Sequence, residues 1–259
     1  MKHAALIAAA LAAASLSPLV CAGQSLRFGI EAQYPPFEFK TAGGELQGLD
    51  VELGKAVCAE AHLQCSWVEN AFDGLIPALQ AKKFDAINSA MNATEQRRKT
   101  IDFTRVLYRV PSMVIAHKNS GIDASADKLK GKSMGVLQGS IQETYAKSHW
   151  EPAGVRVVSY QDQNQVYNDM VSGRLDATLV MAPAGQKGFL SRPDGKDFQF
   201  AGAVHDDKIL GSGIAFGLRK GDADLRNKLD AAIAKLQASG KVKALAAKYL
   251  GEGIDVSVK

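Results

Sequence analysis

The segment KKFDAI at residues 82–87 has a counterpart in GRLDAT at residues 173–178. Each segment follows a helical pattern, begins with polar turn residues and runs into an apolar strand. The two segments therefore occupy the same place in two successive units of strand and helix. An internal repeat of this kind indicates two similar lobes rather than one large sheet.

The sequence on either side of both segments alternates between strand and helix patterns. Short apolar runs alternate with stretches whose apolar residues recur at helical spacing, such as Leu75, Ile76 and Leu79. This alternation is typical of βαβ units and predicts an α/β fold. We expect strands at residues 26–30, 65–68, 132–137, 155–160 and 214–218 and two more that end at residues 87 and 181, with helices at residues 51–61, 72–80, 140–148, 166–172, 223–237 and 242–249.

Length and charge are those of an ordinary globular protein. The chain has 259 residues, 46% of them hydrophobic, which fits one large domain or two modest ones. Its 31 Lys and Arg residues are interspersed with 27 Asp and Glu residues, and the net charge is +4. Because so small a charge without a basic, aromatic-rich run does not favour polyanions, we expect no nucleic-acid partner.

The first 22 residues have the pattern of an export signal. Lys2 precedes an apolar run over residues 4–14, and Ala22 provides a small residue directly before Gly23. The run is shorter than the roughly 20 residues that cross a bilayer. We therefore expect residues 1–22 to be a cleaved signal peptide and the mature protein to be soluble in the periplasm.

Cleavage at that point would leave two cysteines, Cys58 and Cys65. Their spacing matches neither a CxxC motif nor a metal site. Because exported proteins meet an oxidising compartment, we expect a structural disulfide between them, with a pair of buried thiols as the alternative.

The sequence lacks the linear motifs of catalysis and of metal or cofactor binding. The five His residues, at positions 3, 62, 117, 149 and 205, are scattered without metal-ligand spacing. It contains no P-loop, GxSxG or dinucleotide-binding glycine motif. We expect neither a metal nor a cofactor, although acids assembled in space could catalyse a reaction without leaving a linear motif.

Two helix starts that follow strands are candidates for an anion site. Thr94 is a good N-cap for a helix through Lys99, and Arg97 can form a bidentate pair with a carboxylate. Residues 137–140 again combine a strand end, a glycine turn and a helix cap. Two such starts facing each other across a cleft would hold a small anion, because helix N-termini present free N–H groups.

Glu31, Tyr34 and Phe72 also follow strands, where open α/β sheets usually meet their ligands. The aromatic faces can stack on an aliphatic or guanidinium side chain, and Glu31 can neutralise a cation. The alternative is that Phe72 belongs to the core and that Glu31 is solvated.

The mature chain resembles the periplasmic lysine/arginine/ornithine- and histidine-binding proteins of ABC importers, which are bacterial solute-binding proteins of family 3. The resemblance covers essentially the whole mature chain. The motifs that carry it are GLDVEL at residues 48–53, the Cys58/Cys65 spacing, FDGLIP at 72–77, VLQGS at 136–140 and GLRK at 217–220.

This resemblance implies two α/β lobes joined by two hinge strands, with the ligand in the cleft between them. Lobe 1 would comprise residues 23–110 and 214–259, and lobe 2 residues 111–213. The ligand would close the lobes, and the closed protein would dock to an ABC permease in the inner membrane.

The resemblance also implies roles for individual residues. Arg97 would bind the α-carboxylate of the ligand, assisted by the backbone N–H groups of Asn92 and Ile141, and Tyr34 and Phe72 would enclose the side chain. The remaining implied positions are Glu31 at the cationic tip, Ser89 and Gln142 near it, and the backbone of Ala90 and Leu137 on the pocket wall.

Met181 departs from the family pattern, which has an Asp there to receive the α-ammonium group. Ala90 and Asn92 occupy neighbouring positions where the family has serines. Loss of the charge-assisted bond would cost about 1.5–3 kcal/mol, or roughly one to two decades of affinity. Opines or N-acyl arginines, whose α-amine is modified, would suit Met181 better than free basic amino acids.

We therefore expect a monomeric receptor, not an enzyme, for a basic amino acid or an arginine derivative. Two alternative functions are compatible with the same resemblance. Cyclohexadienyl dehydratases have this fold, but residues 180–186 provide no general acid, which leaves Glu31 and Glu143. A receptor that presents its closed form to a sensor kinase would have the same site.

Overall fold

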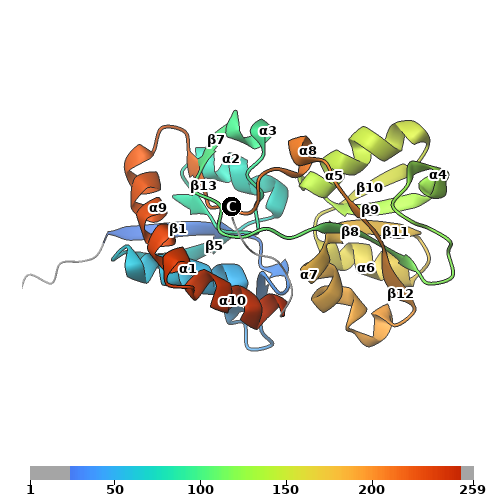
Figure 1. The fold of residues 1–259 in the computed structure, drawn as a ribbon, viewed down its shortest axis with the longest axis horizontal. Coiled ribbons are helices and arrows are strands. Elements are labelled where there is room, and N and C mark those ends of the chain that lie inside the picture. The colour runs from blue at the N-terminus through green and yellow to red at the C-terminus, as the bar shows by residue number, and fades with distance from the viewer. Residues whose placement is uncertain (1–23, 252–259) are drawn as a thin grey trace, which may run out of the picture.

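The computed structural model describes residues 24–251. The predicted signal peptide at residues 1–22 lies outside the described residues. Two five-stranded sheets, each covered by helices, lie side by side, and two stretches of chain connect them (Figure 1). The prediction of a two-lobed α/β fold is confirmed.

The first sheet has the strand order β5-β1-β6-β13-β7. The central strand β1 pairs in parallel with β5 and with β6, and β13 runs antiparallel to β6 and β7. Its strands are β1 (Ser25–Ile30), β5 (Gln64–Glu69), β6 (Ala86–Ile87), β13 (Gly217–Arg219) and β7 (Ile101–Phe103).

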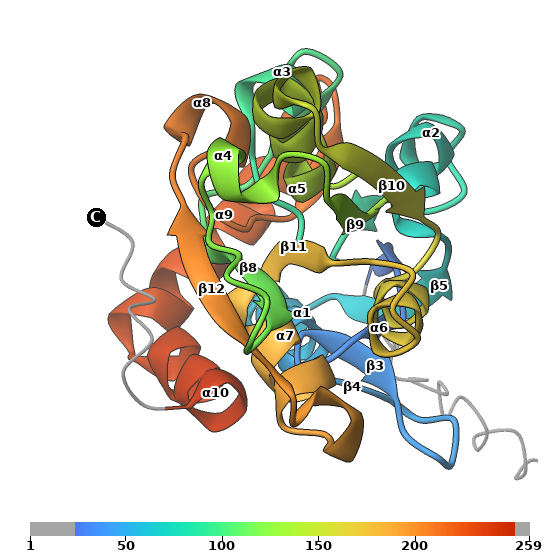
Figure 2. The same ribbon diagram turned by 90° about the vertical axis from the view of Figure 1, so that its right-hand side faces the viewer.

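The second sheet has the order β10-β9-β11-β8-β12 (Figure 2). Here β9 pairs in parallel with β10 and β11, and β8 runs antiparallel to β11 and β12. Its strands are β10 (Arg156–Tyr160), β9 (Ser133–Leu137), β11 (Ala177–Met181), β8 (Ser112–His117) and β12 (Phe198–Val204). The two repeated segments of the sequence thus lead into β6 and β11, at equivalent places in the two sheets.

Helices cover both sheets. Around the first sheet, α1 packs against α9 and α10 while α2 contacts β1, and α1 and α2 lie on opposite sides of that strand (Figure 1). Around the second sheet, α4 and α5 lie on one side and α6 and α7 on the other (Figure 2). The α-helices are α1 (Leu49–Glu60), α2 (Leu75–Gln80), α3 (Glu95–Arg98), α4 (Ala126–Leu129), α5 (Ile141–Tyr145), α6 (Gln163–Val171), α7 (Ala182–Gly185), α8 (Asp207–Leu210), α9 (Ala223–Ala238) and α10 (Lys241–Leu250).

Apolar side chains from strands and helices form a separate core in the second lobe and a larger one centred on the first. Phe28, Phe84 and Phe216 are fully buried in the larger core. Trp150 and Leu179 belong to the core of the second lobe. The central strands are apolar on both faces because helices cover both, as expected for parallel sheets.

The chain crosses between the sheets after β7 and again after β12. Near the first lobe the two crossing segments pair through an antiparallel bridge between Tyr108 and Ile214. All strands of the second sheet lie within residues 112–204. The lobe boundaries at residues 110/111 and 213/214 stay a prediction.

The predicted disulfide is present. Cys58, near the end of α1, bonds to Cys65 in β5, and their Cα atoms are 6.2 Å apart. The bond closes the turn between the helix and the edge strand of the first sheet.

Several predicted elements differ in detail. The helix predicted at residues 72–80 begins as a 3₁₀ turn at Phe72–Gly74 and continues as α2. The helix predicted at residues 140–148 is α5 followed by a π-helical segment, Ala146–Trp150. The strand predicted at 214–218 is shorter, because Ile214 forms only isolated bridges to Asn92 and Tyr108.

A small sheet that the sequence did not predict lies between β1 and α1. Its strands are β2 (Gln33–Tyr34), β3 (Glu38–Lys40) and β4 (Leu46–Gln47), paired antiparallel in that order. Tyr34 pairs directly with Glu38 across β2 and β3. This hairpin brings a glutamate beside an aromatic residue that was predicted to bind the ligand.

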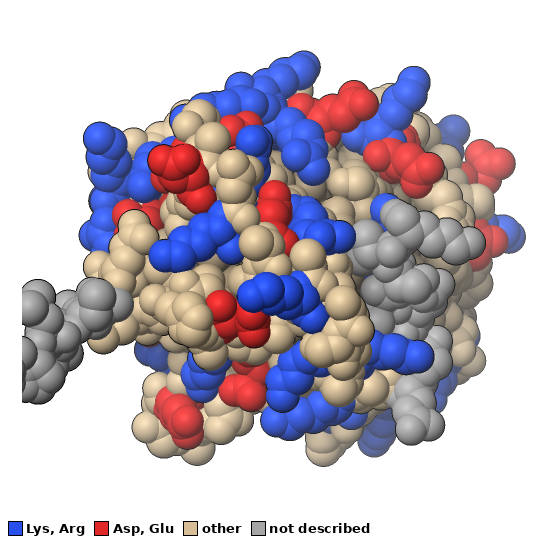
Figure 3. Space-filling model, turned by 60° about the vertical axis from the view of Figure 1, so that its left-hand side comes forward, with Lys and Arg blue, Asp and Glu red and all other residues tan. Residues whose placement is uncertain are grey.

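Acidic and basic side chains are interspersed on the face seen in Figure 3, in keeping with the small net charge. Within residues 24–251 no helix has the length and apolarity needed to cross a membrane. The same residues contain no group of three or more His, Cys, Asp or Glu side chains that could hold a metal ion.

Candidate ligand-binding site

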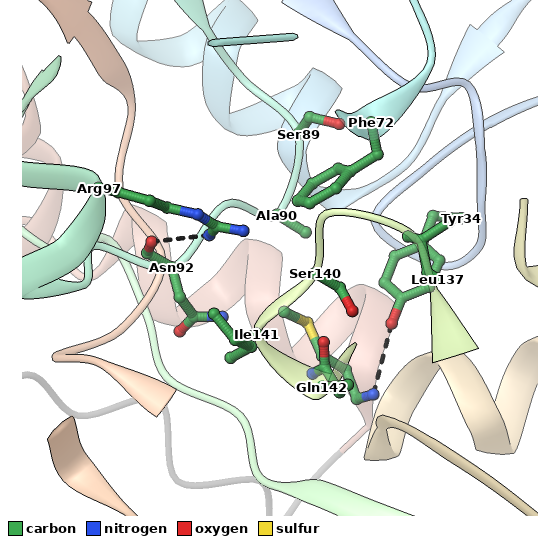
Figure 4. Close-up of a pocket in the computed structure, with 11 residues that line it drawn as sticks. Tyr34, Phe72, Ser89, Ala90, Asn92, Arg97, Leu137, Ser140, Ile141 and Gln142 are labelled. Atoms are coloured by element: carbon green, nitrogen blue, oxygen red, sulfur yellow. Dashed lines mark hydrogen bonds between the residues drawn. The ribbon is translucent and has the colours of Figure 1, made fainter. Parts of the chain in front are cut away.

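A pocket of about 290 Å³ lies where the two lobes meet (Figure 4). Every predicted ligand-binding residue except Glu31 lines it. The lining residues are Tyr34, Phe72, Ser89, Ala90, Asn92, Arg97, Leu137, Ser140, Ile141, Gln142 and Met181.

The parallel strands of both sheets bring these residues together. In the first lobe, Tyr34 follows β1, Phe72 follows β5 and Ser89 follows β6. In the second lobe, Leu137 ends β9 and Met181 ends β11. The carboxyl ends of neighbouring parallel strands meet at one edge of a sheet, where open α/β folds bind their ligands.

Hydrogen bonds to Asp50 fix the turn that follows β6. Ala90 has a positive φ of 42°, which is uncommon for a residue other than glycine. Its N–H donates to Asp50 Oδ2 at 2.6 Å, and the Tyr108 hydroxyl donates to Asp50 Oδ1 at 2.5 Å. Both carboxylate oxygens therefore have partners, although burial raises the pKa of Asp50 to about 6.

Arg97 places its guanidinium group at the boundary between the lobes. Its α3 helix is capped by Thr94, whose side chain accepts from the Arg97 N–H at 3.1 Å. Nη1 donates to the Asn92 carbonyl and Nη2 to the Gly139 carbonyl, each at 2.9 Å. The guanidinium carbon lies 5.5 Å from the centre of the Phe72 ring.

No carboxylate in the described part of the chain forms an ion pair with Arg97. Burial lowers the pKa of Arg97 to about 10, so the group stays charged at neutral pH. A guanidinium has five N–H donors, and the two carbonyls engage two of its nitrogens with one bond each. The remaining donors can bind a carboxylate.

The wall of the second lobe begins at the start of α5. Ser140 caps this helix by accepting from the Glu143 N–H at 3.0 Å. Gln142 is buried and donates to Ser112 Oγ at 2.8 Å. Of these polar groups, the sequence predicted Ser140 only as a helix cap and did not identify Ser112.

Direct bonds also join the lobes around the pocket. The Met181 N–H donates to the Tyr34 hydroxyl at 3.3 Å, as drawn in Figure 4. Gln138 Nε2 donates to Asp73 Oδ2 at 2.8 Å. Together with the bond from Arg97 to the Gly139 carbonyl, these contacts hold the described conformation closed over the pocket.

Glu31 lies behind the pocket wall rather than on it. Only 4% of the residue is exposed, and its N–H donates to Ser89 Oγ at 3.0 Å. Neither carboxylate oxygen has a hydrogen-bond partner within residues 24–251. The alternative in which Glu31 is solvated is therefore wrong.

The buried position of Glu31 changes its acidity. Burial raises its pKa to about 7, and the charge of Asp162 adds to the rise. The backbone N–H of Gln33 acts in the opposite direction and lowers the pKa of Glu31, although its geometry is not that of a hydrogen bond. Two residues that the sequence did not identify, Glu38 and Asp50, lie in the same buried acidic region.

Comparison with known proteins identifies the family. The model for bacterial extracellular solute-binding proteins, family 3, matches residues 26–252. The chain belongs to this family.

Among individual relatives, the histidine-binding periplasmic protein of Salmonella typhimurium is 47% identical over 227 residues, 87% of each chain. The L-arginine-binding protein of Pseudomonas aeruginosa is 44% identical over 251 residues, 96% of each chain. The structure of an ancestral arginine-binding protein bound to arginine superposes with a TM-score of 0.82 at 29% identity, covering 89% of this chain and 100% of that one. The family and these relatives are binding proteins, not enzymes.

The pKa of Glu31 predicts how stability depends on pH. Because the folded-state pKa lies above the ordinary value of 4.5, the protein gains stability from neutral Glu31 at low pH and loses it as pH rises through about 7. This shift corresponds to about 3 kcal/mol. The free energy of unfolding of the wild type, measured relative to Glu31→Gln by urea titration, should therefore fall by up to this amount between pH 4.5 and 8. A difference that does not change with pH would contradict the assignment.

Proposed function

We propose that this chain is an exported periplasmic receptor of an ABC importer and that it binds a carboxylate ligand with a cationic arm. The observation that carries the proposal is Arg97, a half-buried guanidinium at the pocket with free donors and no carboxylate partner in the described chain. A ligand carboxylate would satisfy this charge. Backbone N–H groups of Asn92 and Ile141 would assist.

The ligand arm extends from Arg97 toward the buried carboxylates of the first lobe. Tyr34 and Phe72 line the pocket and provide aromatic faces for its methylene groups. Glu31 lies beyond Ser89, without any hydrogen-bond partner for its carboxylate in the described residues. A cation that approaches Ser89 would favour the ionised form of Glu31. Basic amino acids have this arrangement of charges, and relatives of this chain are named as histidine- and arginine-binding proteins.

Because Met181 lines the pocket, a ligand with a modified α-amine fits it better than a ligand with a free α-ammonium group. Met181 is 5% exposed and lies near the apolar side chains of Ala90 and Ile141. An ammonium group buried there would lack a carboxylate partner, which is costly in a dry site. We therefore infer that the ligand is an arginine derivative such as an opine or N-acyl arginine.

Binding would proceed by closure of the lobes. In the open form each lobe would present one wall of the pocket, and the ligand would favour the closed form by contacting both. The closed, monomeric receptor would then deliver its ligand to a permease in the inner membrane. Cleavage of a signal peptide at residues 1–22 would release the protein into the periplasm.

Replacement of Arg97 tests the proposal. Arg97→Ala should weaken binding of N-α-acetyl-L-arginine and L-arginine by at least about 100-fold, because the ligand carboxylate would be buried without its partner. Calorimetric titration of protein that has been unfolded and refolded to remove carried-over ligand measures this change. Arg98→Ala, an exposed neighbour, serves as the matched control and should bind as the wild type does. Retained affinity in Arg97→Ala would place the carboxylate elsewhere.

Replacement of Met181 tests the state of the α-amine. Met181→Asp restores a carboxylate and should strengthen binding of free L-arginine by about tenfold or more, while binding of N-α-acetyl-L-arginine weakens. Met181→Leu keeps the apolar volume and should change neither affinity substantially. An unchanged or weaker affinity of Met181→Asp for L-arginine would contradict this account of the amine subsite.

Gly139 provides a test of closure. An alanine Cβ there would lie 2.9 Å from Asp73 Cα in the opposite lobe, so Gly139→Ala should hinder the approach of the lobes. Gly131→Ala is the matched control, because Gly131 has the same φ of 75° but nothing within 4 Å of a Cβ. We expect at least about tenfold weaker ligand binding in Gly139→Ala than in the control. X-ray scattering with saturating ligand should show the control more compact than Gly139→Ala. Equal affinity and compaction would contradict closure at this contact.

A further inference from the structure

We propose that Glu38 is a specificity-determining residue that acts through Ser89 and restricts the arm of the ligand to a cationic hydrogen-bond donor, best a guanidinium. The inference rests on the proposed function, since it concerns the far end of the same pocket. Glu38 does not line the pocket. It determines what the pocket-lining hydroxyl of Ser89 can accept.

Ser89 is the centre of a short chain of hydrogen bonds. The Glu31 N–H donates to Ser89 Oγ at 3.0 Å, and Ser89 Oγ donates to Glu38 Oε1 at 3.1 Å. Both side chains are buried, with 1% of each residue exposed. Ser89 lines the pocket, and Glu38 lies behind it.

The chemistry of a hydroxyl makes this arrangement selective. Ser89 has one donor and two acceptor lone pairs. The Ser89 hydroxyl donates its hydrogen to Glu38, and one of its lone pairs accepts from the Glu31 N–H. One lone pair of Ser89 therefore remains to accept from a ligand in the pocket. While Glu38 is ionised, Ser89 can only accept from a ligand.

The surroundings of Glu38 contain further buried acids and no internal counterion. Its Oε2 and both oxygens of Glu31 have no hydrogen-bond partner within residues 24–251. No Lys, Arg or His of the described chain forms an ion pair with Glu31, Glu38 or Asp50. Asp50, by contrast, is satisfied by the Ala90 N–H and the Tyr108 hydroxyl. Glu31 and Glu38 are thus the acids that need a cation from outside.

The small sheet fixes Glu38 in this position. Glu38 lies in β3, directly opposite Tyr34 in β2, and Tyr34 lines the pocket. Burial, followed by the charges of Asp50 and Glu31, raises the pKa of Glu38 well above its usual range. The empty protein therefore favours the protonated form of Glu38, and a bound cation would favour the ionised form.

A guanidinium satisfies this environment better than a neutral arm of the same shape. It has five N–H donors in a plane and no acceptor, so it can donate to the free lone pair of Ser89 while presenting charge to Glu31 and Glu38. A ureido group has a similar shape, but it is neutral and replaces part of the donor set with a carbonyl acceptor. The difference between guanidino and ureido ligands therefore reports on Glu38.

The test compares two ligand pairs of nearly identical shape: L-arginine with L-citrulline, and N-α-acetyl-L-arginine with N-α-acetyl-L-citrulline. The pair whose guanidino member binds the wild type more tightly is used. Glu38→Gln should reduce the preference for the guanidino ligand at least tenfold, mainly by weakening that ligand. Calorimetry in two buffers of different ionisation enthalpy should also show fewer protons released on binding than in the wild type.

Two further variants keep the result interpretable. Glu45→Gln removes an exposed glutamate from the turn between β3 and β4 of the same small sheet and should retain the wild-type preference. Ser89→Ala removes the hydroxyl through which Glu38 acts, and should reduce the preference even if Glu38→Gln folds poorly. A merely structural role for Glu38 would weaken both ligands of a pair equally.

The outcomes separate this inference from the proposed function. If the wild type prefers the guanidino ligand and neither Glu38→Gln nor Ser89→Ala changes that preference, the role of Glu38 is overturned while the proposed function stands. If the wild type binds neither guanidino ligand, the proposed ligand class is overturned and the inference with it.

Discussion

The site depends on a half-buried positive charge that the described chain does not neutralise. Arg97 donates to one backbone carbonyl from each lobe, Asn92 and Gly139, and forms no ion pair among residues 24–251. Carbonyl oxygens orient a guanidinium but carry no net charge. Since withdrawing a charge from water without a counterion is unfavourable, an anion bound at this point would compensate the charge and stabilise the contact between the lobes.

Opposite charge lies at the other end of the same small pocket. Glu31 and Glu38 are buried behind Ser89 with three carboxylate oxygens unpartnered in the described residues. The pocket thus has a cationic group on one side and buried acids behind Ser89 on another, and the apolar Met181 belongs to its lining. A molecule with a carboxylate at one end and a guanidinium at the other fits this polarity, and its modified amine would avoid the cost that Met181 imposes.

Much of this arrangement could be predicted from the sequence. The short apolar runs along the chain predicted β1, β5, β9, β10 and β11, because buried parallel strands leave apolar runs of characteristic length. Those strand ends, together with the family motifs, predicted all the lining residues except Ser140. Their position around one pocket follows from topology, since parallel strands end at one edge.

The remainder depends on contacts that have no local pattern. Strands β2 and β3 are two and three residues long, so Glu38 gave no periodic signal, and its proximity to Ser89 arises only from the fold. The burial of Glu31 and the approach of Gly139 to Asp73 likewise require both lobes in place. The most direct test of the account is calorimetric titration of refolded wild-type protein with L-arginine, agmatine and L-norvaline, and with N-α-acetyl-L-arginine and N-α-acetyl-L-norvaline. Loss of either the carboxylate or the guanidinium should weaken binding at least about 100-fold. Binding of agmatine or of either norvaline compound as tight as that of the matching arginine would contradict a pocket with two charged ends.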